Sequence, residues 1–454
     1  MAAPAAASSD RPTHRAMDTS SPAILHRRRE RTIATMTGEH AADAAADWAG
    51  SGLVALTGHA GGPPLMPPGV AAAVARQITD RLATATGRGA LRIDGAALLA
   101  ERAAFTGHRR RGPVSAGGSC RLLPVADGWA AVSCARPDDP ALLGALIGAE
   151  LPADPWPGVA GWLRTRTGAE LAERAALLGL AAAPLRPPTV AAAPLRAGRI
   201  RPVEGLLVVD FSALWAGPLC AHLLGLAGAR VIKVETPDRP DGARRGHPGF
   251  YRLLHAGHRA VVLDPETPGG RRALAALVDA ADIVIEASRP HALARFGLDA
   301  ADTAGRGAIW VSITAAGRDS TRVGFGDDVA ASAGLIAWDE RGEPVFCGDA
   351  LADPLTGLIA AELAMTAPRH GRGRLFDVAM SDVVAATLVG SPDHPDHPDR
   401  RNRAAQWTGT DWRVDTPSGL IRVAEPRHRA VAGDAANIGE HTAEVLHELR
   451  IPLP

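Results

Sequence analysis

The chain has 454 residues, and its 49 Lys and Arg residues balance 49 Asp and Glu residues, for a formal net charge of +0. This length accommodates two or three domains, and the lack of net charge removes any electrostatic case for binding nucleic acid or an anionic membrane. Four cysteines without CxxC or metal-ligand spacing indicate free thiols in a reducing compartment, so we predict a cytoplasmic protein without a metal site.

The first residues predict little packed structure. Residues 1–45 are rich in Ala, Ser and Arg, and no apolar core follows their basic stretch HRRRERT. A secretory peptide requires such a core, and no apolar run in the chain approaches the ~20 residues of a membrane span. We therefore expect a disordered tail over 1–45 and no association with a membrane.

Residues 46–180 predict helices followed by a small α+β unit. Residues 120–124 and 129–133 form a candidate hairpin, and residues 159–182 contain one or two helices. Arg102 to Arg111 is predicted to be a basic loop. Residues 181–202 are rich in Pro and Ala without a sustained period, which is typical of a linker.

The second half alternates strands with helices. Leu206 to Val209 is wholly apolar, as a strand buried on both faces of a parallel sheet requires. The pattern predicts a Rossmann-like, doubly wound parallel sheet over 203–390, with a ligand crevice beyond the carboxyl ends of its strands. A polar loop and a C-terminal helix are expected in 391–454. The other predicted strands are 231–235, one ending at Leu263, 282–286 and 308–313, and the helices are 219–227, 270–280, 290–296, 327–337 and 353–366.

Two parts of the chain resemble each other. Residues 51–75 and 332–361 share the order Ser, Gly-Leu, apolar pair, Gly-containing turn, Pro and Ala-rich helix. Aligning Pro64 with Pro344 places Asp353 opposite Ala73. The chain therefore holds two related units in this interpretation, and only the second carries a carboxylate.

Asp353 is the first candidate for chemistry. It begins an Ala- and Leu-rich helix, where a plain N-cap role explains most aspartates. A partly buried carboxylate at a helix start is also a competent nucleophile toward an activated acyl group. Asp327 and Asp328 stand at another helix start, where capping is the expected role.

Other candidates point less clearly to one function. The WAGP turn at Trp215 lacks the GxGxxG pattern, which disfavours a dinucleotide oxidoreductase. Arg244 and Arg245 follow the second strand and could face a phosphate or simply solvent. His255 and His258 precede the third strand, where a structural role is the more common one.

Seven segments then show a resemblance, in chain order, to the class III CoA-transferase family of the CaiB/BaiF type. They are VVDFSALWAGPLCAHLLGLAGARVIKVE, GFYRLLHAGHRAVVLDPETPGGRRAL, ADIVIEASRPHALARFGLD, GDDVAASAGL, ALADPLTGLIAAELAM, GRGRLFDVAMSD and the terminal IGEHTAEVLHELRIP. Residues 48–150 resemble family material that normally follows the Rossmann-like domain. The resemblance thus implies a tandem or permuted chain with a degenerate first unit.

The resemblance implies acyl-CoA as a substrate, a small carboxylic acid as its partner, and no permanently bound cofactor. Asp353 would attack the thioester and form a mixed aspartyl anhydride. The family forms interlocked dimers, which implies a homodimer or an intrachain pseudo-dimer here. The family's CoA-contacting positions fall on Trp215, Ala216, Leu263, Ser288, Ala292 and Arg295.

Departures from the family pattern leave alternatives open. His255, His258 and Ala287 replace the usual Asn, Lys and Asn. Some family members are racemases, whose proton-transferring histidine would lie near Gly326. The sequence therefore leaves two alternative functions, an acyl-CoA racemase and a non-catalytic CoA-binding protein, and it does not identify the acyl group.

Overall fold

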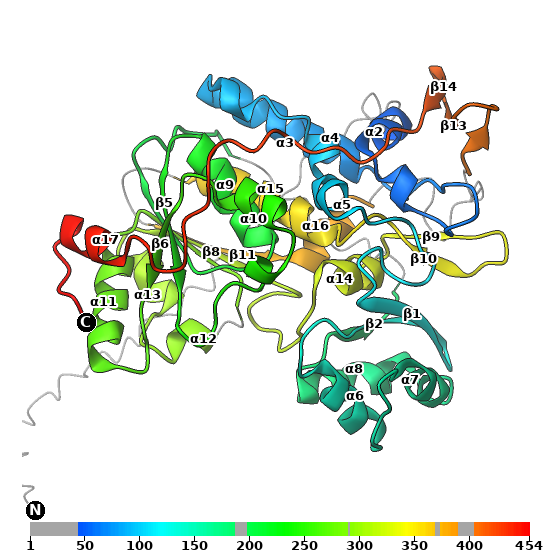
Figure 1. The fold of residues 1–454 in the computed structure, drawn as a ribbon, viewed down its shortest axis with the longest axis horizontal. Coiled ribbons are helices and arrows are strands. Elements are labelled where there is room, and N and C mark those ends of the chain that lie inside the picture. Colours follow the sequence, from blue (N-terminus) through cyan, green and yellow to red (C-terminus); the bar gives the residue numbers. More distant parts are fainter. Residues whose placement is uncertain (1–43, 187–197, 289–290, 368–372, 389–403) are drawn as a thin grey trace, which may run out of the picture.

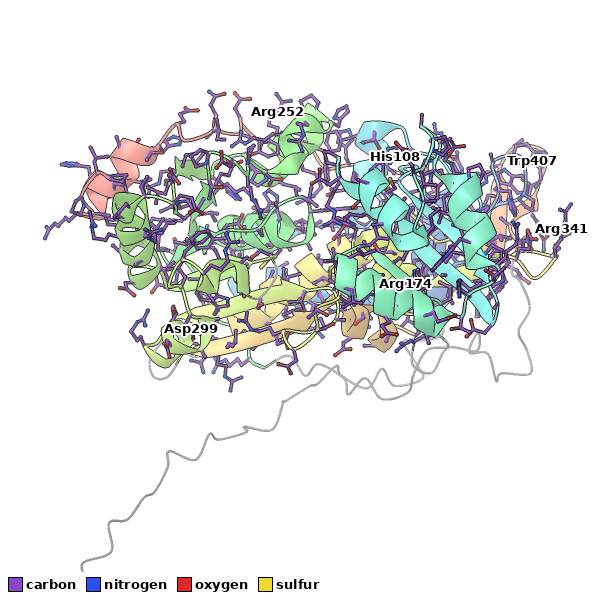
Figure 2. The ribbon with its side chains drawn as sticks, turned by 90° about the horizontal axis from the view of Figure 1, so that it is seen from below. His108, Arg174, Arg252, Asp299, Arg341 and Trp407 are labelled. Atoms are coloured by element: carbon purple, nitrogen blue, oxygen red, sulfur yellow. The ribbon has the colours of Figure 1, made fainter. Side chains whose placement is uncertain are left out.

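The structure is a computed structural model that describes residues 44–186, 198–288, 291–367, 373–388 and 404–454. The predicted tail up to residue 43 and residues 187–197 of the predicted linker lie outside the described residues. Figure 1 shows a parallel-sheet lobe at one end of the molecule and a small lobe built from the first half of the chain at the other. In Figure 2, Asp299 lies in the parallel-sheet lobe and Arg174 lies in the small lobe.

A six-stranded, all-parallel sheet forms the larger lobe, in the order β11-β8-β7-β4-β5-β6. The predicted doubly wound α/β fold is therefore confirmed. The chain enters the sheet at the central strand β4 and continues through β5 to β6 at one edge. It then crosses to the other side of β4 and adds β7, β8 and β11, which creates a topological switch point between β4 and β7. The strands are β4 Leu207–Asp210, β5 Arg230–Glu235, β6 Arg259–Val262, β7 Ile283–Glu286, β8 Ile309–Thr314 and β11 Arg374–Ala379.

Helices cover both faces of this sheet because successive strand residues point in opposite directions. Val208 lies in the core cluster with α9 (Ala216–Leu226) and α15 (Ala352–Thr366). Val209 lies in the other cluster, which holds residues of α11 (Pro268–Asp279) and α17 (Thr442–Glu448). The further helices of this lobe are α10 Pro248–His255, α12 His291–Ala294, α13 Ala300–Gly305, α14 Gly326–Ser332 and α16 Met380–Ala386.

The helices of the first half share a core with the second half. Trp48, Ile78 and Leu98 belong to the same buried cluster as α9 and α15. The predicted 46–180 unit therefore does not have one core of its own, because its first helices pack into the core of the second half. The resemblance of this unit to family material stays a prediction. These elements are α2 Ala44–Ser51, η1 Val54–Leu56, α3 Ala71–Thr86, η2 Gly89–Leu91, α4 Gly95–Leu98 and α5 Glu101–Thr106.

A small α+β subdomain has its own core. The predicted hairpin is present as β1 Cys120–Val125 and β2 Gly128–Ser133, and β3 Ala182–Pro184 pairs with β2. Residues 182–184 are therefore strand and not linker. The covering helices are α6 Asp139–Ile147, α7 Trp156–Leu163 and α8 Gly168–Leu178.

Three further expectations were wrong in part. The helix predicted over 327–337 ends at Ser332, because Gly334 adopts a φ of 100° and the chain turns into β9 (Ile336–Trp338), which pairs with β10 (Pro344–Phe346). The loop predicted after 391 includes β12 Gln406–Trp407, β13 Trp412–Thr416 and β14 Gly419–Arg422. Strand β11 was not predicted as a strand.

The end of the chain runs from the helices of the first half to the parallel-sheet lobe. Residues between β14 and α17 run past α4 and α10 before α17 packs beside β6 (Figure 1). Helix α17 confirms the predicted C-terminal helix. None of the helices in the described residues combines the length and apolarity needed to cross a membrane.

Candidate active site

Asp353 is the second residue of α15, and it does not cap that helix. The N-cap of α15 is Leu351, so the N-cap role considered for Asp353 is wrong. No hydrogen bond to the Asp353 carboxylate exists among the described residues. Its Oδ2 faces Gly326 so closely that a Cβ on that glycine would lie 2.5 Å away. Gly326 thus lets the Asp353 carboxylate and Ala350 lie directly against its backbone, because any side chain at position 326 would collide with both.

Three other aspartates surround this carboxylate. Asp327 Oδ1 accepts a hydrogen bond from Ala350 N at 2.8 Å, and Asp328 accepts one from Phe325 N at 2.8 Å. Capping is therefore confirmed for Asp328, whereas Asp327 fixes the turn before α15. Burial and the charge of Asp349 raise the pKa of Asp327 to about 6. Burial, together with these acids, raises the pKa of Asp353 to about 7.

Arg102 brings a cation to this cluster of acids. It lies in α5, so the loop predicted at this position was wrong. Its Nε donates to Asp349 Oδ2 at 2.8 Å, and its Nη2 donates to Asp349 Oδ1. The two residues are 247 positions apart in the chain, and no local pattern in the sequence indicated that they would meet.

Asp349 has two positive or polar neighbours. His108 Nδ1 lies 3.2 Å from Asp349 Oδ2, which also accepts from Arg102. These contacts hold the pKa of Asp349 well below its usual range despite complete burial. Figure 2 labels His108 among the elements of the first half of the chain. A Cβ on Gly117 would lie 3.8 Å from Arg102 Nη2, so the loop before β1 also reaches this site.

Trp215 links this cluster to the carboxyl end of β4. The Arg102 guanidinium carbon lies 5.2 Å from the centre of the Trp215 ring, which meets Phe250 edge-on at 5.2 Å. The tryptophan side chain is buried. It is the N-cap of α9, so the predicted CoA-binding turn and the Asp353 cluster meet through Arg102.

A buried ion network holds the Trp215 turn. Leu214 adopts a φ of 71°, and its N donates to Asp241 Oδ1 at 3.0 Å. Lys233, the sole lysine of the chain, donates to Asp241 Oδ2 at 2.8 Å and to the Ser212 carbonyl oxygen. Burial opposes the charge of Lys233, but Asp210 and Asp241 outweigh that effect and raise its pKa.

Ala216 and Leu263 differ in what they can contact. Ala216 is the first residue of α9, and α15 approaches it closely, because a Cβ on Gly357 would lie 2.6 Å from its carbonyl oxygen. Leu263 follows β6, and its side chain belongs to the core on the other face of the sheet. Only the backbone of Leu263 is therefore available to a ligand.

The other three predicted CoA positions follow β7, next to β4 in the sheet. Ser288 is half-buried, and its Oγ has no hydrogen-bond partner within the described part of the chain. Ala292 lies in α12, and Arg295 follows it with its guanidinium carbon 5.2 Å from the centre of the Phe296 ring. No described contact joins these three residues to Asp353. They occupy the expected edge of the sheet but not the immediate surroundings of the carboxylate.

Arg244, His255 and His258 lie against other side chains of the fold. Arg244 Nη2 donates to Glu235 Oε2 at 2.6 Å and stacks on Tyr251. His255 and His258 are buried, and desolvation lowers the pKa of both, for His258 to about 3. Both imidazoles are therefore neutral near pH 7.

Two cavities of about 470 Å³ lie away from Asp353. One is bounded by residues such as Ala103, Arg110 and Glu425, and the other by residues such as His222 and Arg259. Neither is lined by a predicted CoA-binding residue. Within the described ranges, no group of His, Cys, Asp and Glu side chains is arranged to hold a metal ion.

Comparison with known proteins agrees with the resemblance. Residues 203–442 match the sequence model of CoA-transferase family III. The succinate–glutarate CoA-transferase of Agrobacterium fabrum is 32% identical over 211 residues, which are 41% of this chain and 53% of that protein. The human succinyl-CoA:glutarate CoA-transferase is 29% identical over 220 residues, 43% of this chain and 50% of that protein.

A solved structure also matches. The CAIB/BAIF family protein from Brucella suis is 30% identical, with a TM-score of 0.38 and coverage of 42% of this chain and 56% of that chain. The present chain spans about half the length of these relatives. Because the family model covers more than half of the chain, the protein belongs to CoA-transferase family III.

Proposed function

We propose that this protein is a cytoplasmic acyl-CoA:carboxylate CoA-transferase in which Asp353 forms an aspartyl acyl anhydride. The observation that carries the proposal is the half-buried Asp353 carboxylate at the start of α15, next to the Arg102–Asp349 pair that contacts Trp215. The names of the relatives support the reaction class, because both are named as CoA-transferases of dicarboxylic acids. Trp215, Ala216, Ser288, Ala292, Arg295 and the backbone of Leu263 are the proposed CoA contacts.

The reaction begins when the Asp353 carboxylate attacks the thioester carbonyl carbon. A C–O bond forms, the C–S bond breaks, and the CoA thiolate leaves with its electron pair. The acyl group in the anhydride is still activated toward attack by a nucleophile, whereas hydrolysis would convert it to an unreactive free acid. In the complete exchange, the thiolate ends on the acceptor acid and one acceptor oxygen ends on the donor acid, so Asp353 is regenerated. Only the ionised form of Asp353 attacks, so its raised pKa makes the first step sensitive to pH near neutrality.

The racemase alternative requires a proton-transferring partner beside Asp353. The position that faces Asp353 Oδ2 is Gly326, which has no side chain. This geometry favours anhydride formation over proton transfer at the α-carbon. A CoA-binding protein without catalysis would bind CoA and leave Asp353 unmodified.

The experiment that tests the function is acyl-enzyme trapping. We expect succinyl-CoA to add one succinyl mass to the full-length protein, and hydroxylamine to convert the modified Asp353 to a hydroxamate that peptide mapping locates. Asp353→Asn should abolish the adduct. Asp279→Asn is the matched control, because Asp279 is an exposed acid paired with Arg306 far from the site. An unchanged adduct in Asp353→Asn would overturn the assignment, and solvent deuterium at the α-carbon without an adduct would support the racemase.

We further propose an intrachain pseudo-dimer, since helix α3 of the first half packs directly on α15. A monomer mass in solution, measured by light scattering at several protein concentrations, supports this arrangement. A concentration-independent dimer contradicts it.

A further inference from the structure

We propose that Arg102, supplied by the first half of the chain, is a positioning residue that balances the acids around Asp353 and so allows the nucleophile to carry its charge. This inference rests on the proposed role of Asp353. It assigns a part in the reaction to α5, a segment outside the region that matches the family.

Arg102 is held in place from both ends of its helix. Its neighbour Glu101 is buried and accepts hydrogen bonds from Arg429 Nε at 2.6 Å and Arg429 Nη2 at 2.9 Å. Phe105, one turn later, stacks on His428 with ring centres 3.9 Å apart. Helix α5 is thus clamped by the segment that leads to α17, and its arginine is directed at Asp349 and Trp215.

The pairing geometry suits a fixed charge. Two nitrogens of Arg102 meet the two oxygens of Asp349, which is the bidentate arrangement that restricts both side chains. The Trp215 ring covers the guanidinium at 5.2 Å, and 26% of the arginine side chain remains exposed. A lysine could supply the charge at this position but not the two parallel hydrogen bonds.

The charges that act on Asp353 come from three elements. Helix α14 contributes Asp327 and Asp328, the turn before α15 contributes Asp349, and α5 contributes Arg102. Asp328 has its own cation, because Arg322 Nη2 lies 3.5 Å from its Oδ2. Arg102 therefore opposes the remaining acids, and without it the Asp349 carboxylate beside an ionised Asp353 would keep only its contact with His108.

The test compares pH profiles of acyl-enzyme formation from succinyl-CoA in single-turnover experiments. Arg102→Gln removes the cation, so the midpoint of the profile should move to higher pH by about one unit. Asp349→Asn removes an anion, so the midpoint should move to lower pH. The double variant Arg102→Gln/Asp349→Asn should return toward the parent profile, because it removes one charge of each sign. Arg102→Lys should keep the parent midpoint with a lower rate.

Arg109→Gln is the matched control, because this neighbouring arginine is exposed and lies 3.7 Å from Glu425. Its profile should equal that of the parent. A purely structural role for Arg102 would lower the rate in both single variants without moving their midpoints in opposite directions, and that result overturns the inference. If Arg102→Gln does not fold, an unchanged midpoint of the pH profile in Asp349→Asn also overturns the inference.

Failure of the proposed function can be recognised separately. If the parent protein forms no adduct at Asp353, carbon NMR of aspartate-labelled protein still reports the protonation of Asp353, with Asp353→Asn identifying its signal. A titration of that signal that shifts to higher pH in Arg102→Gln supports the charge relationship without any turnover. An identical titration in parent and variant refutes it.

Discussion

Gly357 in α15 and Ala216 at the start of α9 meet so closely that a Cβ on the glycine would lie 2.6 Å from the alanine carbonyl oxygen. The same Cβ would lie 2.9 Å from the Leu219 Cβ. The two helices can therefore approach only because position 357 has no side chain. This approach fixes the distance between the helix that carries Asp353 and the turn that carries Trp215.

We expect Gly357→Ala to lower the free energy of unfolding by about 1–3 kcal/mol, because the added methyl must separate two packed helices. CoA affinity should fall as well, since the turn at Trp215 moves away from α15. Urea denaturation and calorimetric titration with CoA measure the two effects. Gly305→Ala is the control, because a methyl group at that position of α13 would meet no atom of another residue within 4 Å. Equal stability of the two variants would contradict the packing argument.

The rate of acyl-enzyme formation should rise with pH through a midpoint near the pKa of Asp353, about 7. At pH 6 only about one tenth of the carboxylate is ionised, so the rate should be roughly tenfold below its plateau. Rapid mixing of enzyme with succinyl-CoA, followed by acid quench and mass measurement, gives this profile. A rate that is constant between pH 5 and 8 would show that Asp353 is ionised throughout.

Asp353→Asn should make the protein more stable above pH 7. In the folded state Asp353 keeps its proton up to pH about 7, whereas in the unfolded state it loses the proton near its ordinary value of 3.8. Protonation therefore favours the folded state, and this contribution is lost as pH rises from 3.8 through 7. Asparagine has no proton to lose, so the free energy of unfolding of the variant at pH 8 should exceed that of the parent by on the order of 1–3 kcal/mol.

The measurement for this variant is thermal denaturation at pH 5 and pH 8. The difference in Tm between variant and parent should be larger at pH 8 than at pH 5. A difference that is the same at both values, or larger at pH 5, excludes a raised pKa for Asp353.

Lys233→Met should destabilise the fold by about 3–5 kcal/mol, because it leaves Asp210 and Asp241 buried without their cation. The turn at Leu214 should loosen too, since Asp241 accepts its backbone N–H. Urea denaturation and Trp fluorescence report the two changes. Arg230→Gln is the control, because its ion pair with Glu448 lies at the surface and should contribute no more than about 1 kcal/mol. Similar losses of unfolding free energy in both variants would mean that the buried network stabilises the fold no more than a surface ion pair does.

Much of the sheet could be predicted because burial on both faces leaves a direct mark on composition. Strands β4, β7 and β8 are largely apolar and β5 is rich in Val and Ile, and their predicted ranges agree with the structure to within about two residues. Strand β11 was missed because it is an edge strand that contains two charged residues and is exposed over its first half. The β9–β10 hairpin was missed because its strands are only three residues long.

For the candidate site too, local features could be predicted from the sequence and long-range contacts could not. Sequence alone determined that an acid begins a buried Ala-rich helix and that a tryptophan turn follows a central strand, because both features arise from neighbours in the chain. Tertiary structure decided that Arg102 and Asp349 meet, that Asp353 lies against the Gly326 backbone, and that Leu263 points into a core. Such contacts join distant residues whose encounter depends on how helices pack, and packing is set by shape and burial over the whole core, which no local pattern records.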